Sequence, residues 1–386
     1  MTTPAPIRRY RVPGRVELVG KHVDYGGGRS LTCAVELPLD GTAQPTRVRW
    51  STYAAAVARR VARDFPQLRN GADVRLSSSL PPSAGLSSST ALTVAITRAL
   101  VDATGLSDDP AFQEHLTTPI AFAEYVAAIE TGSAFGPWPG DAGVGVRGGA
   151  QDHVAVCCSR AGMVGQFSYI PARELGFTPW PTDYQLAIAV SGVRASKTGN
   201  AQAAYNRAAD AVRWLVREWR GMTYRDDATL AAALASASDA GDRLHAIAAN
   251  ATGAPVPAEY LTRRLAQFRE ECDVIVPGVA AALAARDFAK LGQLVDRSQR
   301  LAESALENQV PETIALQQRA RALGAVAASA FGAGFGGAVW AMVRGAEATH
   351  FIAEWEARYR TDFPQMPRRV ARGAKFLLTR PSAATF

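Results

Sequence analysis

The chain has 386 residues, of which 48% are hydrophobic and 20% are charged, a composition typical of a soluble globular protein. Its formal charge of +7 is spread along the sequence rather than gathered in one patch, so we expect no nucleic-acid partner. The densest basic run, residues 58–63, has helical spacing and predicts a solvated helix face. No apolar run is long enough to cross a bilayer, and the N-terminus lacks a signal-peptide core. We therefore expect a cytoplasmic protein with no membrane partner.

The first elements of the chain are two β-rich segments, residues 10–19 and 31–35, which flank a polar loop. That loop carries Lys21, His22 and Asp24 directly before three glycines. Bulky polar side chains beside a glycine run are typical of a loop that presents functional groups at a sheet edge. A plain hairpin turn with chance polar residues is the alternative interpretation.

Residues 50–65 have helical periodicity, with Ser51 as a suitable N-cap, and residues 72–76 alternate as a strand does. The stretch LPPSAGLSSSTA at residues 80–91 then leads into a second helical pattern. Gly85 permits a backbone conformation that a β-carbon would obstruct, and three serines follow where the helix begins. The free amides of a helix N-terminus bind anions, so the stretch predicts a phosphate site whose hydroxyls hold Mg²⁺. An ordinary capped helix after a turn is the alternative.

The middle of the chain predicts a helix over residues 109–130, kinked or divided at Pro119, and then a loop with seven glycines over residues 131–149. Strands are expected at residues 154–158 and 163–169, followed by a linker over residues 171–183. The second half predicts three strands and a series of amphipathic helices. The expected strands are residues 185–191, the run after the glycine loop GAGFGG, and residues 376–378.

Three motifs in this order resemble the GHMP small-molecule kinases, specifically the galactokinase family. They are PGRVELVGKHVDYGGG at residues 13–28, LPPSAGLSSSTA at residues 80–91, and FGAGFGGAVWAMV from Phe331. The segments GGAQDH and SGVRASKTGNAQAAYNR also resemble that family, whereas no Walker-type GxxxxGK[ST] motif is present. The resemblance implies an α/β fold of two domains, residues 1–182 and 183–386, with the active site in the cleft between them.

The resemblance also implies roles for individual residues. Asp152 resembles the base that draws the proton from the anomeric hydroxyl, with Arg15 as its partner. The residues that resemble sugar contacts are Lys21, by its position, and His22, Asp24 and Tyr205. The residues that resemble the ATP site are Trp50, Gly85, Leu86, Ser87, Ser88, Ser89, Gly334 and Gly336. Ser89 and Glu130 resemble the Mg²⁺ ligands.

Each of these residues also has a structural interpretation. Asp152 would then be a helix cap, Glu130 a solvated helix-end carboxylate and Trp50 a core residue. Tyr205 would be a residue on a helix face, and His22 a hydrogen-bonded structural histidine.

The chain departs from the family pattern at several positions. Glu17 stands where asparagine is usual, and Lys21 stands where the family has a glutamate that contacts the sugar near carbon six. Ser329 and Phe331 replace an arginine and a threonine, and the segment after the first motif is short. An ammonium at Lys21 favours a sugar with a carboxylate at carbon six. A local ion pair between Lys21 and Glu17 is the alternative.

By resemblance, the expected function is ATP- and Mg²⁺-dependent phosphorylation of a hexose at its anomeric hydroxyl, with galactose as the default substrate. A kinase for a hexuronic acid such as galacturonate, or for another sugar, is an alternative in the same class. A catalytically weak regulator that binds sugar or nucleotide is an alternative of another class. A monomer is favoured, and the expected small-molecule partners are the sugar and ATP.

Overall fold

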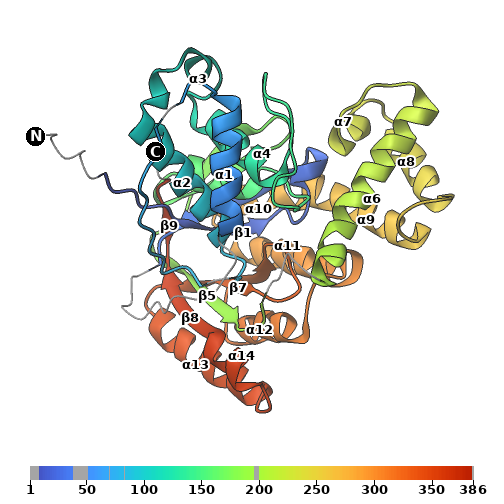
Figure 1. The fold of residues 1–386 in the computed structure, drawn as a ribbon. Coiled ribbons are helices and arrows are strands. Elements are labelled where there is room, and N and C mark those ends of the chain that lie inside the picture. Colours follow the sequence, from blue (N-terminus) through green and yellow to red (C-terminus); the bar gives the residue numbers. More distant parts are fainter. Residues whose placement is uncertain (1–7, 38–50, 69, 82, 195–199, 385–386) are drawn as a thin grey trace, which may run out of the picture.

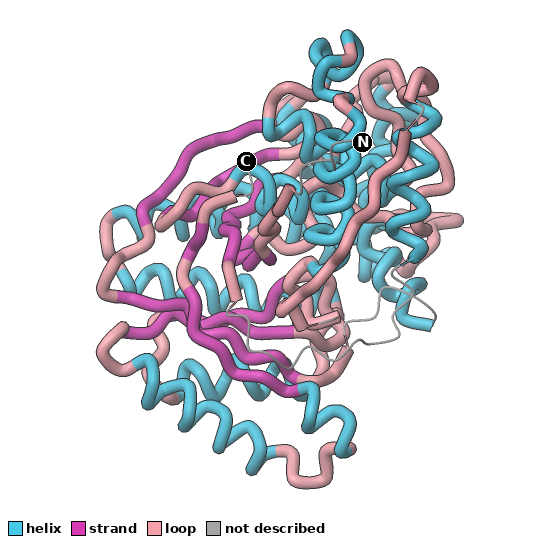
Figure 2. Tube along the Cα trace, turned by 60° about the vertical axis from the view of Figure 1, so that its left-hand side comes forward, coloured by secondary structure: helices cyan, strands magenta, loops and turns pink. Residues whose placement is uncertain are grey.

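The computed structural model describes residues 8–37, 51–68, 70–81, 83–194 and 200–384 of the chain (Figure 1). Its strands form two antiparallel sheets, which Figure 2 shows in magenta. The first sheet has the order β1-β2-β3-β4, and β9 pairs with the end of β2. Its strands are β1 (Gly14–Val19), β2 (Arg29–Val35), β3 (Met163–Ser168), β4 (Arg173–Pro179) and β9 (Pro381–Ser382).

The second sheet has the order β6-β7-β5-β8. Its strands are β5 (Tyr184–Ser191), β6 (Ala327–Phe331), β7 (Ala338–Arg344) and β8 (Ala374–Thr379). One buried apolar core joins the two sheets, because it contains Val16 and Leu31 of the first sheet together with Ile188 and Trp340 of the second. The predicted domain division at residue 182 falls between β4 and β5 and stays a prediction, since this core spans it.

Helices of the first half pack into a second core with Phe167 of β3, whose side chain is fully buried. They are α1 (Ser51–Asp64), α2 (Ser88–Thr104), α3 (Pro110–His115), α4 (Pro119–Thr131) and α5 (Gln151–Cys158), with the short turn η2 (Leu106–Asp108). These helices therefore form the layer that positions the serine-rich stretch and Asp152 beside the first sheet.

A separate helical lobe, at the right of Figure 1, packs around a third core that includes Val23 of the polar loop. It consists of α6 (Asn200–Thr223), α7 (Leu230–Ala235), α8 (Ala240–Ala249) and α9 (Ala258–Glu270). The remaining helical elements are η1 (Asp24–Gly26), η3 (Glu271–Ile275), α10 (Val276–Ala284), α11 (Phe288–Leu301), η4 (Ala302–Leu306), α12 (Pro311–Ala322), α13 (Ala348–Asp362) and α14 (Arg368–Gly373). Among the described residues, no helix is long and apolar enough to span a membrane.

The structure confirms the division of the predicted helix at Pro119, which begins α4. Three local predictions are wrong. Residues 72–76 form no strand, because no strand among the described residues pairs with them and Val74 and Leu76 are exposed. Residues 154–158 belong to α5. Nearly all of this helix is buried, so its sequence lacks the alternation of apolar and polar residues that marks an amphipathic helix. The expected linker at residues 171–183 contains β4, an edge strand that is mostly exposed or half-buried.

The basic run at residues 58–63 is only partly a solvated face. Arg60 is fully buried and forms an ion pair with Asp64 one turn later on the same helix. Arg59, its neighbour, is exposed. The charge pattern of the sequence does not distinguish a buried arginine from an exposed one, so it did not predict the burial of Arg60.

Candidate active site

An arginine–aspartate pair joins the first sheet to α5. The Nε of Arg15 donates a hydrogen bond to Oδ1 of Asp152 at 2.7 Å, and its Nη2 lies 2.6 Å from the same oxygen. The hydroxyl of Ser87 donates to the other oxygen, Oδ2, at 2.7 Å. Donors thus meet both oxygens of Asp152, an arrangement that favours the ionised carboxylate.

The serine-rich stretch forms a tight turn into α2. Gly85 and Ser87 both have left-handed backbones, with φ of 78° and 58°. A β-carbon at Gly85 would lie 3.2 Å from the carbonyl oxygen of Phe331, so this turn packs against the third motif. Ser88 and Ser89 are half-buried and occupy the first turn of α2, where the helix amides have no partner within the helix.

The polar loop after β1 brings His22 and Asp24 to the same place. The imidazole of His22 lies 3.1 Å from the carbonyl oxygen of Ala333 through Nε2, and 3.1 Å from the hydroxyl of Tyr25 through Nδ1. A carbonyl only accepts, so Nε2 carries a proton, and in the neutral ring Nδ1 accepts from Tyr25. Asp24 accepts from the backbone amide of Gln151 at 3.3 Å. Burial raises the pKa of Asp24, and the nearby Asp152 carboxylate adds to that rise.

Glu130, at the end of α4, lies beside a histidine that the sequence analysis did not single out. The Oε2 of Glu130 is 3.3 Å from Nε2 of His153, and both side chains are buried. The sequence offered one signal for His153, namely its position directly after Asp152 in the motif GGAQDH.

The arginine–aspartate pair, the polar loop and the Glu130–His153 pair line one pocket, and Gly85, Ser87, Ser88 and Ser89 lie outside its lining. Residues of the loop 131–149 and of the third motif complete its wall. Its lining residues include Arg15, Glu17, His22, Asp24, Thr90, Glu130, Gln151, Asp152 and His153. From the third motif, Gly332 and Ala333 line this pocket, whereas Gly334 packs closely on Asn308 and Gly336 on Val193. The role of Gly334 and Gly336 at ATP therefore stays a prediction.

The structure places Lys21 outside the pocket lining, so its assignment as a sugar contact gains no support and stays a prediction. Its side chain is almost fully buried away from the pocket lining, and Nζ donates to the hydroxyls of Ser298 and Ser329, each at 2.8 Å. The alternative, a direct ion pair with Glu17, also stays a prediction: the two charges interact, but the described contacts of Glu17 are with the amide of Gln151. Burial lowers the pKa of Lys21, while the nearby carboxylate of Glu271 opposes that shift.

Other predicted residues cannot be placed in the pocket. Trp50 and the short segment of residues 38–50 lie outside the described residues, and so does the side chain of Tyr205 on α6. Leu86 is buried, and its carbonyl accepts from the backbone amide of Arg15 at 3.3 Å. Leu86 therefore holds the serine-rich turn against β1.

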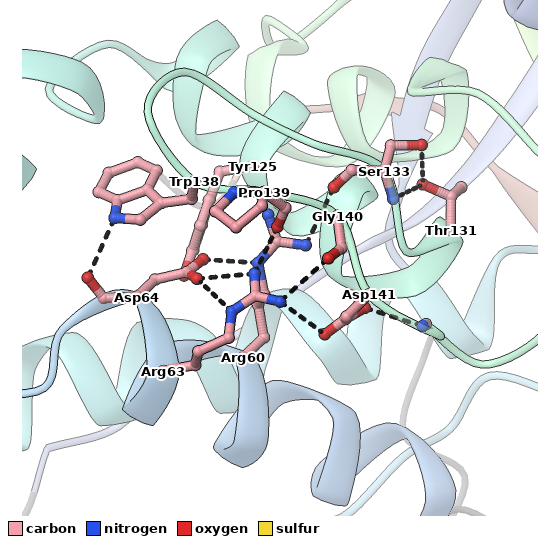
Figure 3. Close-up of polar contacts among 11 residues, drawn as sticks. Arg60, Arg63, Asp64, Tyr125, Thr131, Ser133, Trp138, Pro139, Gly140 and Asp141 are labelled. Carbon is pink, nitrogen blue, oxygen red and sulfur yellow. Dashed lines mark hydrogen bonds and ion pairs between the residues drawn. The ribbon is translucent and has the colours of Figure 1, made fainter.

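A polar cluster on α1 anchors the glycine-rich loop that walls the pocket (Figure 3). Asp64 accepts from the Nε atoms of both Arg60 and Arg63. The Nη1 of Arg60 donates to the carbonyl of Ser133 at 3.0 Å, and Arg63 donates to the carbonyls of Pro139 and Gly140. The loop is thus tied along its first half to a helix of the N-terminal layer.

The same loop also closes on its own base. The amide of Asp141 donates to the carbonyl of Gly132 at 2.8 Å, and the amide of Val144 donates to the carbonyl of Glu130 at 2.9 Å. A carboxylate oxygen of Asp141 accepts from the amide of Gly143 at 2.8 Å. These bonds fix the backbone that carries Glu130.

Comparison with protein families matches both halves of the chain. The GHMP kinases N terminal domain matches residues 52–132, the GHMP kinases C terminal domain matches residues 279–361, and the galactokinase galactose-binding signature matches residues 2–56. The chain is a GHMP kinase of the galactokinase family. It is therefore a sugar kinase, and its predicted two-domain α/β fold is confirmed.

Relatives and solved structures agree with that assignment. The chain is 26% identical over 371 residues to a galactokinase of Actinobacillus pleuropneumoniae serotype 5b, covering 88% of this chain and 85% of the relative. It is 27% identical over 385 residues to a galactokinase of Chloroflexus aggregans, covering 92% and 88%. Its fold is similar to that of Lactococcus lactis galactokinase complexed with galactose, with a TM-score of 0.68, 17% identity and coverage of 98% and 94%. It is less similar to L. major mevalonate kinase, with a TM-score of 0.52, 16% identity and full coverage of both chains.

Proposed function

We propose that this sugar kinase transfers the γ-phosphoryl group of ATP to the anomeric hydroxyl of a neutral hexose, with galactose as the first candidate. The observation that carries the proposal is Asp152, whose carboxylate is held by Arg15 and Ser87 at the wall of a pocket that also contains His22 and Asp24. A fixed carboxylate in such a place accepts the proton of a sugar hydroxyl as that oxygen attacks phosphorus.

Arg15 has two tasks in this scheme. Its guanidinium keeps Asp152 ionised before the reaction, and its fixed positive charge offsets the negative charge on the transferring phosphoryl group. The hydrogen bond from Arg15 to the carbonyl of Gly85 ties this charge to the serine-rich turn, which is the proposed site of the nucleotide phosphates.

The residues proposed for Mg²⁺ fit a hard cation. Ser89 supplies a hydroxyl at the start of α2, and Glu130 supplies a carboxylate in the pocket that Thr90, the neighbour of Ser89, also lines. No group of three or more His, Cys, Asp or Glu able to hold a metal occurs in the described part of the chain. Mg²⁺ commonly uses one or two protein oxygens together with substrate phosphates, and it would supply charge neutralisation there.

A hexuronate loses its supporting argument, because the ammonium of Lys21 is bonded elsewhere. The pocket lining instead has four carboxyl groups and one cation, Arg15, which is already paired with Asp152. A substrate carboxylate would be repelled by the ionised Asp152 in this pocket. We therefore propose galactose or another neutral hexose rather than galacturonate.

The test is a panel of hexoses, hexuronates and other sugars with ATP and Mg²⁺, in which ADP release is measured and the phosphorylated carbon is located by phosphorus NMR. We expect turnover with a neutral hexose, 1-phosphate as product, and dependence on added Mg²⁺. Glu130→Gln should shift half-maximal rate to higher Mg²⁺ concentration. Sugar binding without turnover by any member of the panel would favour the regulator over the kinase.

A further inference from the structure

Glu17 is an active-site acid that the proposed reaction does not use. It lies on β1 two residues after Arg15, lines the same pocket, and its side chain is only 3% exposed. One of its oxygens, Oε2, accepts a hydrogen bond from the side-chain amide of Gln151. The other, Oε1, has no hydrogen-bond partner in the described structure.

Neither nearby cation neutralises Glu17 by direct pairing. Arg15 is ion-paired with Asp152, and Lys21 donates to two serine hydroxyls. A buried carboxylate without a paired cation is costly, so the acid keeps its proton. In agreement, burial raises the pKa of Glu17 to about 8, with Arg15 and Lys21 opposing the shift and Asp152 adding to it.

The position of the proton follows from the hydrogen bond to Gln151. An amide N–H donates to Oε2, so the carboxylic hydrogen belongs on Oε1, the oxygen that has no partner. A buried hydroxyl donor without an acceptor is unfavourable unless a ligand supplies one. Thr32, opposite Glu17 on β2, also has a hydroxyl without a partner, so it is the competing acceptor within the protein.

We propose that Glu17 contacts the sugar, donating a hydrogen bond as a neutral carboxylic acid from Oε1 to a hydroxyl oxygen of the bound hexose. This proposal rests on the proposed function, which it sharpens by naming a specificity residue for uncharged, hydroxyl-bearing substrates. A sugar carboxylate at the same position would bring negative charge near the ionised Asp152. The charged and titratable groups around Glu17 are Arg15 on its own strand, Lys21, Asp24, Asp152 and Tyr169.

Protonation of Glu17 is testable without any substrate. Its folded-state pKa of about 8 lies above the ordinary value of 4.5, so Glu17 stabilises the fold below pH 4.5 and loses that contribution as the pH rises to about 8. Glu17→Gln has no proton to lose. The melting temperature of wild type should therefore fall relative to that of Glu17→Gln between these pH values, and parallel curves would overturn the neutral acid.

The sugar contact is tested by calorimetric titration, without nucleotide, of the neutral hexose with the highest turnover in the panel. Glu17→Met should weaken binding about tenfold, because it leaves a sugar oxygen without its donor. Glu17→Gln keeps a donor at this position, since its amide oxygen must face Gln151, and should lose less than Glu17→Met. Above pH 8 wild-type affinity should fall while that of Glu17→Gln stays level.

Thr32→Val is the matched control, because it removes the competing acceptor and keeps the shape of the side chain. Its sugar affinity should be no lower than that of wild type. Wild-type affinity in Glu17→Met, or an equal loss in Glu17→Gln and Glu17→Met, would overturn the donated hydrogen bond. In either case wild type would still turn over the hexose, so the proposed function would stand and only the Glu17 contact would be overturned. If wild type did not turn over any hexose, both the proposed function and the contact would be overturned.

Discussion

Two buried polar clusters lie near β1, and they differ in how completely their hydrogen bonds are made. In the scaffold cluster, which comprises Lys21, Glu271, Ser298, Gln299 and Ser329, every buried side-chain polar atom has a partner. In the pocket cluster, which comprises Arg15, Glu17, Glu130, Asp152 and His153, atoms of Glu17 and His153 lack hydrogen-bond partners in the described structure.

The difference separates a structural role from a functional one. Glu271 accepts from the backbone amide of Gly20 and from Ser298, and Gln299 accepts from Ser329 and from the amide of Ala330. The scaffold cluster thus ties the polar loop to α11 and β6, and its described polar side-chain atoms already have hydrogen-bond partners within the protein. Unfilled hydrogen-bonding capacity in the pocket cluster is what a substrate is able to use.

The largest effect should come from the pocket cluster. Asp152→Asn keeps the shape of the side chain but removes the proton acceptor, and general-base losses are about 10² to 10⁴ in rate. We expect kcat to fall by that factor, with little change in nucleotide affinity measured by titration. A variant within a few-fold of wild type would remove Asp152 from the mechanism.

The scaffold cluster should respond in stability rather than in specificity. Lys21→Met removes the cation near the buried Glu271, and breaking a buried charged network commonly costs about 3 kcal/mol or more. Urea unfolding should show this loss, whereas the ratio of kcat/KM for galactose to that for galacturonate should stay as in wild type. Lys290→Met, at an exposed lysine on α11, is the control and should be neutral. A changed substrate ratio in Lys21→Met would return Lys21 to the sugar site.

The smallest effect should come from the anchor of the glycine-rich loop. Arg63→Ala removes donors to the carbonyls of Pro139 and Gly140, which together are about 1 kcal/mol because Arg63 is partly exposed. Hydrogen exchange at the amides of Asp141 and Val144 should become about fivefold faster. Arg59→Ala, at an exposed position on the same helix, should leave it unchanged, and equal exchange in both variants would show that the loop holds itself.

Short sequence motifs predicted the pocket residues that belong to those motifs. Arg15 and Asp152 were assigned by their motifs, and the structure brings them into contact although 137 residues separate them. The contacts of Lys21 could not be predicted from its motif, because they are made with Ser298 and Ser329, which are 277 and 308 positions away along the chain. No local pattern reports which distant hydroxyls reach an ammonium.

The protonation of Glu17 also depends on residues that its own motif does not identify. A glutamate in a sequence is expected to be ionised. Glu17 is a neutral acid because it is buried and because Arg15 is already paired with Asp152. The strand predicted at residues 154–158 failed for a related reason. A segment that is buried nearly all round loses the periodicity that distinguishes a helix from a strand.

The pairing of β9 with β2 has a consequence for how the protein is made. β9 covers Ala34 and Val35 at the end of β2, beyond the part of that strand that β3 reaches. A ribosome adds β9 about two hundred residues after β4, so the first sheet is assembled early and completed late. During that interval the end of β2 remains an open edge on the nascent chain, able to pair with another strand. Synthesis that stalls before Pro381 would prolong the exposure of this edge at Ala34 and Val35.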